Sequence, residues 1–195
     1  MITEREALKE QEITRNLNSW NKIFGRIKQG EGPMIGNAGE YAVMAELLKR
    51  GIVAGLTPRN TPGFDIIATA NTHTANVRVK TKTEDTQGWQ WNAHAKTREV
   101  FTHRRNDGDF VVLVDLGNAG HPNRYFVVPT VVIDSWLKTD FDTWLASPGR
   151  DPNKPHSEDN LRRILRYNEY VARLHPYKEA WAILFETPKD VQGPV

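Results

Sequence analysis

One short segment of the chain brings three basic side chains to the same side of a strand. Residues 77–81 read as a strand, so Arg78, Lys80 and Lys82 alternate with apolar or small residues and share one face. Like charges at this spacing repel one another unless an anion lies between them. We therefore expect an anionic ligand at this face, and phosphate is the first candidate.

Asp65 is the carboxylate nearest to this row of cations in the expected sheet. Residues 64–69 read as the partner strand of a hairpin, and a turn centred between residues 72 and 73 would place Asp65 opposite Lys80 on the same face. A carboxylate in this position could belong to the ligand site. Two plainer interpretations stay open, in which Asp65 caps the backbone of a turn and the lysines form a solvated sheet edge.

Glu40 is a second carboxylate in an unusual position. It lies in a helical pattern over residues 37–50 that is apolar most of the way round, so this helix is expected to be largely buried. A carboxylate beside a buried surface is expected to be paired with a positive charge or to serve a functional site. Glu40 could therefore serve the ligand site, or it could form a structural ion pair with Arg78.

The remaining elements follow from apolar periodicity and from turn-forming Gly and Pro residues. Residues 109–116 are too apolar for a half-exposed strand and are expected to be buried on both faces. Residues 30–36 read as a loop, and Ser157 reads as the start of a last long helix. The order of elements predicts an α/β domain. Further strands are expected at residues 52–57 and 125–128, with shorter helical segments after Pro129 and around Trp181 and Leu184.

Composition limits the class of protein. The chain has 195 residues, with 26 Lys plus Arg, 24 Asp plus Glu and no cysteine. This near-balance excludes a protein that binds through bulk charge, and the lack of cysteine excludes disulfides and thiolate metal sites. No apolar run approaches the roughly 20 residues that cross a bilayer. We expect a cytoplasmic protein without membrane contact.

The chain is expected to have three parts. Residues 1–30 predict an amphipathic helix, residues 36–187 a single domain, and residues 188–195 a tail. The apolar stripe of the first helix is expected to pack on the domain or on a second copy, which would give a homodimer.

Positive charge is concentrated in one segment despite the neutral total. Residues 76–105 hold seven basic and three acidic side chains. Within this segment, Arg98, Arg104 and Arg105 could follow a nucleic-acid backbone. A local field of this kind is what a phosphate ligand would experience.

The residues around Glu40, Asp65 and Lys80 resemble the PD-(D/E)xK nuclease superfamily. The matching positions are Gly39-Glu40 in the helix, Asp65 in GFDIIA, and Lys80 in VRVKT. The later segments DFVVLVDL, YFVVP and YKEAWAIL also resemble its downstream strands and closing helix, so the resemblance spans roughly residues 36–184. It implies a restriction-endonuclease-like fold with a mixed central sheet flanked by helices, here with an extra N-terminal helix.

The resemblance also implies a chemistry, namely hydrolysis of DNA phosphodiester bonds by a metal-dependent endonuclease. Asp65 would be the main ligand of Mg²⁺ (or Mn²⁺), with Glu40 as an assisting ligand and a backbone oxygen at Val79. Lys80 would orient the attacking water and stabilise the developing charge. Metal and ammonium together supply the electrostatic stabilisation that this transition state requires.

Arg78 departs from the superfamily pattern, which has Glu or Gln at this position. A guanidinium carries a fixed positive charge and cannot bind a cation. Either the metal is held by Asp65, Glu40 and backbone or water oxygens, or the site has lost its metal and only grips phosphate, with Arg78 and Lys82 among the contacts. The second alternative is a catalytically inactive module that binds nucleic acid or a protein partner.

Overall fold

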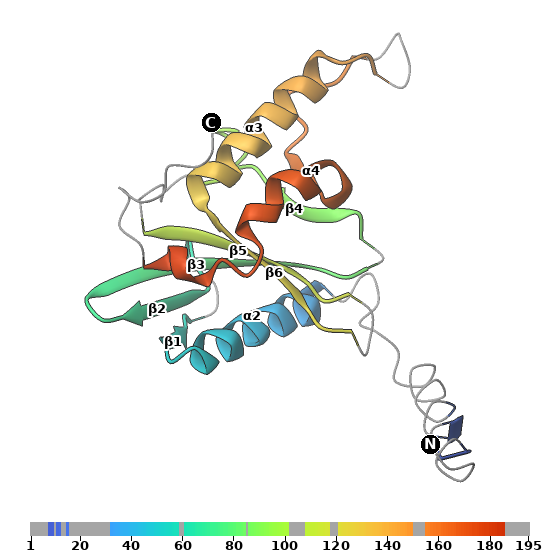
Figure 1. Cartoon of the computed structure of the whole chain (residues 1–195). Coiled ribbons are helices and arrows are strands. Elements are labelled where there is room, and N and C mark those ends of the chain that lie inside the picture. The colour runs from blue at the N-terminus through green and yellow to red at the C-terminus, as the bar shows by residue number, and fades with distance from the viewer. Residues whose placement is uncertain are drawn as a thin grey trace.

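A mixed five-stranded sheet forms the centre of the molecule in a computed structural model of the chain (Figure 1). Its order is β1-β2-β3-β5-β6, and all neighbours are antiparallel except β3 and β5. Every residue of β5 is buried, which confirms the expected central strand. The strands are β1 (Val53–Leu56), β2 (Ile66–Ala70), β3 (His73–Lys82), β5 (Asp109–Asp115) and β6 (Arg124–Pro129).

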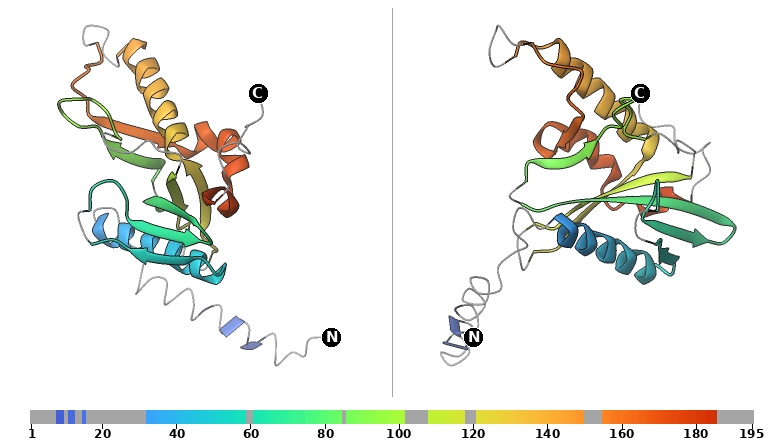
Figure 2. Two further views of the ribbon diagram at one scale, coloured as in Figure 1. Left: turned by 90° about the vertical axis from the view of Figure 1, so that its left-hand side faces the viewer. Right: turned by 180° about the vertical axis from the view of Figure 1, so that it is seen from behind.

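Helices cover both faces of this sheet. Helix α2 (Gly32–Lys49) lies on one side, and α3 (Thr130–Ala146) and α4 (Tyr167–Leu174) lie on the other (Figure 2). A two-stranded antiparallel ribbon, made of β4 (Gly88–Asn92) and β7 (Arg162–Arg166), lies on the α3 side. This mixed central sheet flanked by helices confirms the predicted α/β fold class.

The structure describes the domain almost completely and little of the chain before it. The expected helix over residues 1–30 lies largely outside the described residues, and the expected tail over 188–195 lies wholly outside them. No helix in the described ranges is long and apolar enough to span a membrane. The described residues are 8, 9, 11, 12, 15, 32–58, 61–84, 86–101, 108–117, 121–149 and 155–185.

Two hydrophobic cores hold the layers together, one on each face of the sheet. On the α2 side, Val43 and Leu47 are fully buried against β2, β3 and β5. On the α3 side, the ribbon contributes Trp89 and Trp91 to a core that also contains Ile133 of α3. Successive side chains of β3 therefore point alternately towards these two packed layers.

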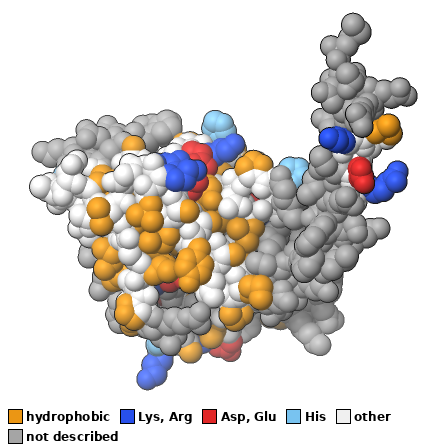
Figure 3. Space-filling model, turned by 90° about the horizontal axis from the view of Figure 1, so that it is seen from below, with side chains coloured by type: hydrophobic (Ala, Val, Ile, Leu, Met, Phe, Trp, Pro, Cys, Tyr) orange, Lys and Arg blue, Asp and Glu red, His pale blue; other side chains and the backbone are white. Residues whose placement is uncertain are grey.

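The outward face of α2 carries exposed apolar side chains. Met34, Tyr41 and Leu48 follow one another at seven-residue intervals, and each is more than half exposed. Seen from below, hydrophobic side chains gather on this side of the molecule (Figure 3). The predicted contact with a second copy involves residues 1–30 and so falls largely outside the described residues.

The sequence prediction was wrong about both ends of the domain. Residues 32–36 were expected in a loop, but α2 already begins at Gly32. The segment after Ser157 was expected to be a long helix, but it forms strand β7 and then the short helix α4. Tertiary pairing overrides helical spacing here, because Leu165 of β7 pairs with the fully buried Trp89 of β4.

The hairpin of β2 and β3 forms as predicted, but its register differs by two residues. Ala70 pairs with His73 and Ile66 pairs with Val77, so the turn is centred one residue earlier than expected. Asn71 makes this possible because it adopts a left-handed conformation with φ of 52°. Asp65 therefore precedes the first pair of the ladder and does not lie opposite Lys80.

Candidate functional site

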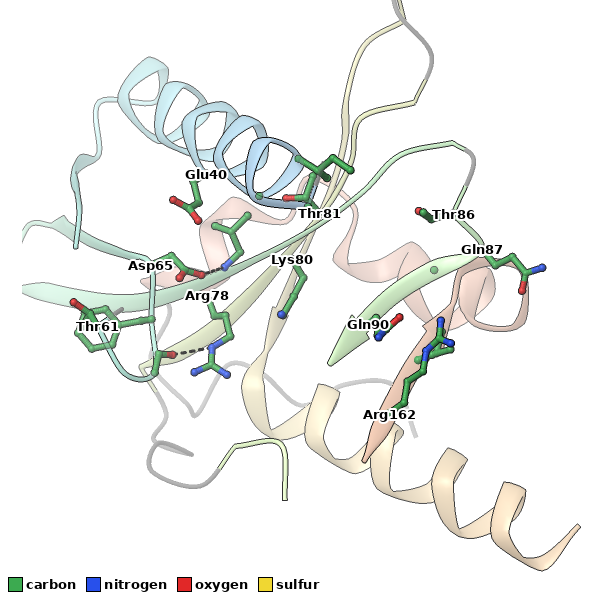
Figure 4. A pocket seen from close by; sticks show the side chains of 18 residues that line it. Glu40, Thr61, Asp65, Arg78, Lys80, Thr81, Thr86, Gln87, Gln90 and Arg162 are labelled. Carbon is green, nitrogen blue, oxygen red and sulfur yellow. Dashed lines mark hydrogen bonds between the residues drawn. The ribbon is translucent and has the colours of Figure 1, made fainter. Parts of the chain in front are cut away.

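An open groove of about 780 Å³ crosses the edge of the sheet where β2 begins. Its walls come from the first half of α2, the loop before β2, the middle of β3, and the ribbon (Figure 4). Glu40, Asp65 and Lys80 all line it. The structure thus brings together in one groove the three residues to which the resemblance gave the central chemistry.

Asp65 occupies a defined position because the backbone holds it on two sides. Its N–H donates to the Val77 carbonyl at 2.9 Å, and its carboxylate oxygen Oδ2 accepts the Val79 N–H at 2.7 Å. The carboxylate thus replaces the backbone acceptor that a longer β2 would have supplied. A carboxylate can accept about four hydrogen bonds or metal contacts, so this bond orients the group without saturating it.

Glu40 reaches the groove because α2 approaches β3 unusually closely. A Cβ atom added at Gly39 would lie only 1.8 Å from the Thr81 hydroxyl oxygen, so a larger residue would force the helix away from the strand. Figure 4 shows the Glu40 carboxylate above Asp65, on the same side of β3. Gly39 is therefore a packing requirement for the position of the neighbouring carboxylate.

Lys80 lies over an aromatic ring at the floor of the groove. Its ammonium nitrogen is 5.7 Å from the centre of the Trp91 ring. Burial lowers the pKa of Lys80, the neighbouring Arg78 lowers it further, and Asp65 opposes both effects. A lysine with a lowered pKa exchanges a proton with bound water at a pH nearer to neutrality.

Arg78 lines the same groove, and part of its guanidinium makes contacts within the fold. Its Nε donates to the Gly63 carbonyl at 3.0 Å, and its guanidinium lies 5.3 Å from the centre of the Phe101 ring. Burial lowers the pKa of Arg78, while Asp65 raises it. Arg78 therefore anchors the loop that leads into Asp65.

Lys82 is separated from the other two cations. Its side chain is 5% exposed and its ammonium lies 2.8 Å from Asp115, which is fully buried. Arg124 donates to the same carboxylate. Lys82, which the sequence predicted as a phosphate contact, does not line the groove. In this fold it forms a buried ion pair with Asp115.

Of the other predicted nucleic-acid contacts, Arg98 is described by the structure, and it does not line the groove. Arg98 pairs with Asp159 at 2.6 Å and lines a separate hollow beside α3. Arg104 and Arg105 lie outside the described residues.

Sequence reasoning did not find the ribbon residues of the groove. Gln90 and Arg162 form part of its wall opposite Asp65 (Figure 4). Gln90 lies between two buried tryptophans, and this alternation is the signal that could have placed it on an exposed strand face. Arg162 could not be placed, because its segment was expected to be helical.

The donor chemistry of the groove fits a hard divalent cation. Within the described ranges, no three His, Cys, Asp or Glu side chains are grouped so that they could hold a metal ion. Mg²⁺ prefers oxygen ligands and keeps several of its waters, and one or two carboxylates are enough for it. Asp65 and Glu40 could hold such an ion. Val79, whose backbone oxygen was the third expected ligand, lines the same groove.

Comparisons with known proteins give a similarity of structure without a match of sequence family. No protein-family model and no curated protein matches the chain. Among solved structures, the bacterial homing endonuclease I-Ssp6803I is similar at 16% identity and a TM-score of 0.48, over 83% of this chain and 98% of that one. At this level of identity, the function of the groove is inferred from its own residues.

The close approach at Gly39 can be tested by adding a methyl group. We expect Gly39→Ala to lower the free energy of unfolding by about 1–3 kcal/mol, because the new Cβ overlaps the Thr81 side chain. Chemical denaturation measures this change, and adding Thr81→Ala should recover part of the loss.

Gly36→Ala is the matched control on the same helix, because a Cβ there meets nothing within 4 Å in the described structure. It should leave stability unchanged or raise it by up to about 1 kcal/mol. Equal effects of the two substitutions would contradict the packing role of Gly39.

The lowered pKa of Lys80 predicts a pH-dependent effect on stability. The unfolded chain binds this proton more readily than the folded chain, so the protonated lysine opposes folding below its folded-state pKa. We expect Lys80→Met to raise the Tm at neutral pH, and the gain to shrink as pH rises towards the ordinary lysine pKa. Thermal unfolding across this range measures it. The exposed Lys96→Met is the control, and a gain that grows with pH would contradict the account.

Proposed function

We propose that the chain is a metal-dependent nuclease that hydrolyses DNA phosphodiester bonds in the groove between α2, β3 and the ribbon. The observation that carries this proposal is the Asp65 carboxylate, held by the Val79 N–H in a groove that Glu40 and Lys80 also line. Two carboxylates beside an ammonium match the needs of phosphodiester hydrolysis, because negative charge builds on the phosphate in the transition state.

Each residue has a distinct task in this proposal. Asp65 and Glu40 hold Mg²⁺ or Mn²⁺, which when bound supplies electrostatic stabilisation to the phosphate oxygens. The Lys80 ammonium donates a hydrogen bond that orients the attacking water and stabilises the charge that develops on the phosphate. Arg78 keeps the loop before Asp65 in place through Gly63 and directs its remaining N–H groups to phosphate oxygens.

The reaction is a direct displacement by water. The water oxygen bonds to phosphorus as the bridging P–O bond to the leaving nucleotide breaks. The proton lost by the water passes to solvent, and the leaving oxygen takes a proton from solvent. No covalent enzyme intermediate is needed.

One observation favours a second function, a module that binds nucleic acid without cutting it. Arg78 places a fixed positive charge beside Lys80, where the superfamily has a group that can face a metal. Two neighbouring cations in an open groove can hold a phosphate without any metal. This alternative gives DNA binding that does not depend on divalent cations.

A cleavage assay with duplex and single-stranded DNA in Mg²⁺ or Mn²⁺ separates the two functions. We expect Asp65→Asn and Lys80→Met each to lower the cleavage rate by roughly 100-fold or more. Asparagine keeps an oxygen that can accept the Val79 N–H, so the first substitution removes the charge and keeps the local fold.

Lys49→Met, at an exposed position near the end of α2, should leave the rate unchanged. Cleavage that survives both groove substitutions would exclude this site as the catalytic centre. Metal-independent DNA binding by a wild-type chain that does not cleave would support the binding module.

A further inference from the structure

The ribbon presents two chemically different faces. In its register Trp89 pairs with Leu165 and Gln90 pairs with Ile164, so residues alternate between the core and the outside. Trp89, Trp91 and Leu165 are buried. The opposite face carries the exposed side chains of Gln90, Asn92 and Arg162.

These three exposed side chains are available for a ligand. Within the part of the chain that the structure describes, no hydrogen bond or ion pair engages the amide of Gln90, the amide of Asn92 or the guanidinium of Arg162. Arg162 donates to Asn160 through its backbone N–H, which leaves its side chain free of that contact. An amide and a guanidinium offer several donors each, and the amides also offer acceptors.

The outer face of the ribbon belongs to the same groove as the proposed catalytic residues. Gln90 and Arg162 line the wall that faces Asp65 and Arg78, with Lys80 between the two walls (Figure 4). A nucleic acid whose phosphate lies at Lys80 would therefore have its neighbouring bases beside the ribbon.

The chemistry of this face fits the edges of paired bases. Its exposed side chains are an arginine and two amides, which match guanine O6/N7 and adenine N6/N7 in the major groove. The aromatic rings of the ribbon point into the core, so they are not placed to stack on the bases of a single strand.

The dimensions of the ribbon also fit duplex DNA. Two strands lie about 4.8 Å apart, and the major groove of B-form DNA is about 12 Å wide and accepts a two-stranded ribbon. The major groove of an RNA duplex is too narrow for side chains to read. Arg162 adds positive charge that complements the DNA backbone.

We propose that the β4–β7 ribbon reads DNA sequence in the major groove of a duplex through Gln90, Asn92 and Arg162. This proposal rests on the proposed function, since it assumes that DNA lies in the groove. It adds that the ligand is double-stranded and that cleavage or binding is sequence-selective.

The test is selection of the full-length protein on a randomised DNA duplex pool without divalent metal, so that binding is measured apart from cleavage. We expect the wild type to enrich a sequence motif. Each of Gln90→Ala, Asn92→Ala and Arg162→Ala should lose the preference at one or two positions, by roughly 5- to 150-fold per contact. Lys49→Ala, exposed on α2, should retain the full motif.

A modified duplex then identifies the groove that is read. In the selected sequence, 7-deazaadenine replaces each preferred adenine, which removes the N7 acceptor in the major groove and keeps base pairing. We expect wild-type affinity to fall, and the amide variant that no longer reads that adenine to be insensitive to the change.

The outcomes separate this proposal from the function on which it rests. DNA binding or cleavage with no enriched motif, or a motif unchanged in all three variants, would overturn readout by the ribbon and leave the nuclease proposal standing. Binding to single-stranded DNA alone would also overturn it. Absence of both DNA binding and cleavage in the wild type would overturn both proposals.

Discussion

The hydrogen bond from the Val79 N–H to Asp65 Oδ2 is the interaction on which the site depends. Strand β2 begins to pair at Ile66, so the backbone of β3 beyond Val77 needs another acceptor on that side. The side chain of Asp65 supplies it and is thereby held at the open edge of the sheet. The groove exists because β2 stops here, while α2 and the ribbon continue on either side.

Each of the three alternating cations of β3 lies near an aromatic ring, but their positions relative to the groove differ. Arg78, Lys80 and Lys82 lie near the rings of Phe101, Trp91 and Trp89, respectively, and these contacts offset part of the cost of desolvating the charges. Only the first two line the groove. Lys82 lies deeper, where Asp115 on the neighbouring parallel strand neutralises it, and the pair joins β3 to β5 at matched positions.

Local patterns were sufficient to predict most of the fold, and long-range pairing explains what they missed. Glu40, Asp65 and Lys80 could be found because each lies within or beside a short, regular helix or strand. The position of Lys82 depends on Asp115 in another strand, and the ribbon depends on Leu165 pairing with Trp89. The hairpin register depended on the left-handed Asn71, which strand alternation alone does not reveal.

The central claim is that Asp65 and Glu40 form one cation site beside Lys80. The most direct measurement is the anomalous scattering of Mn²⁺ in crystals of the full chain, compared with crystals of Asp65→Asn. The account predicts a peak between the Asp65 and Glu40 carboxylates in the wild type and its loss in the variant. Ordered carboxylates with no peak between them, or a peak that persists in the variant, would contradict it.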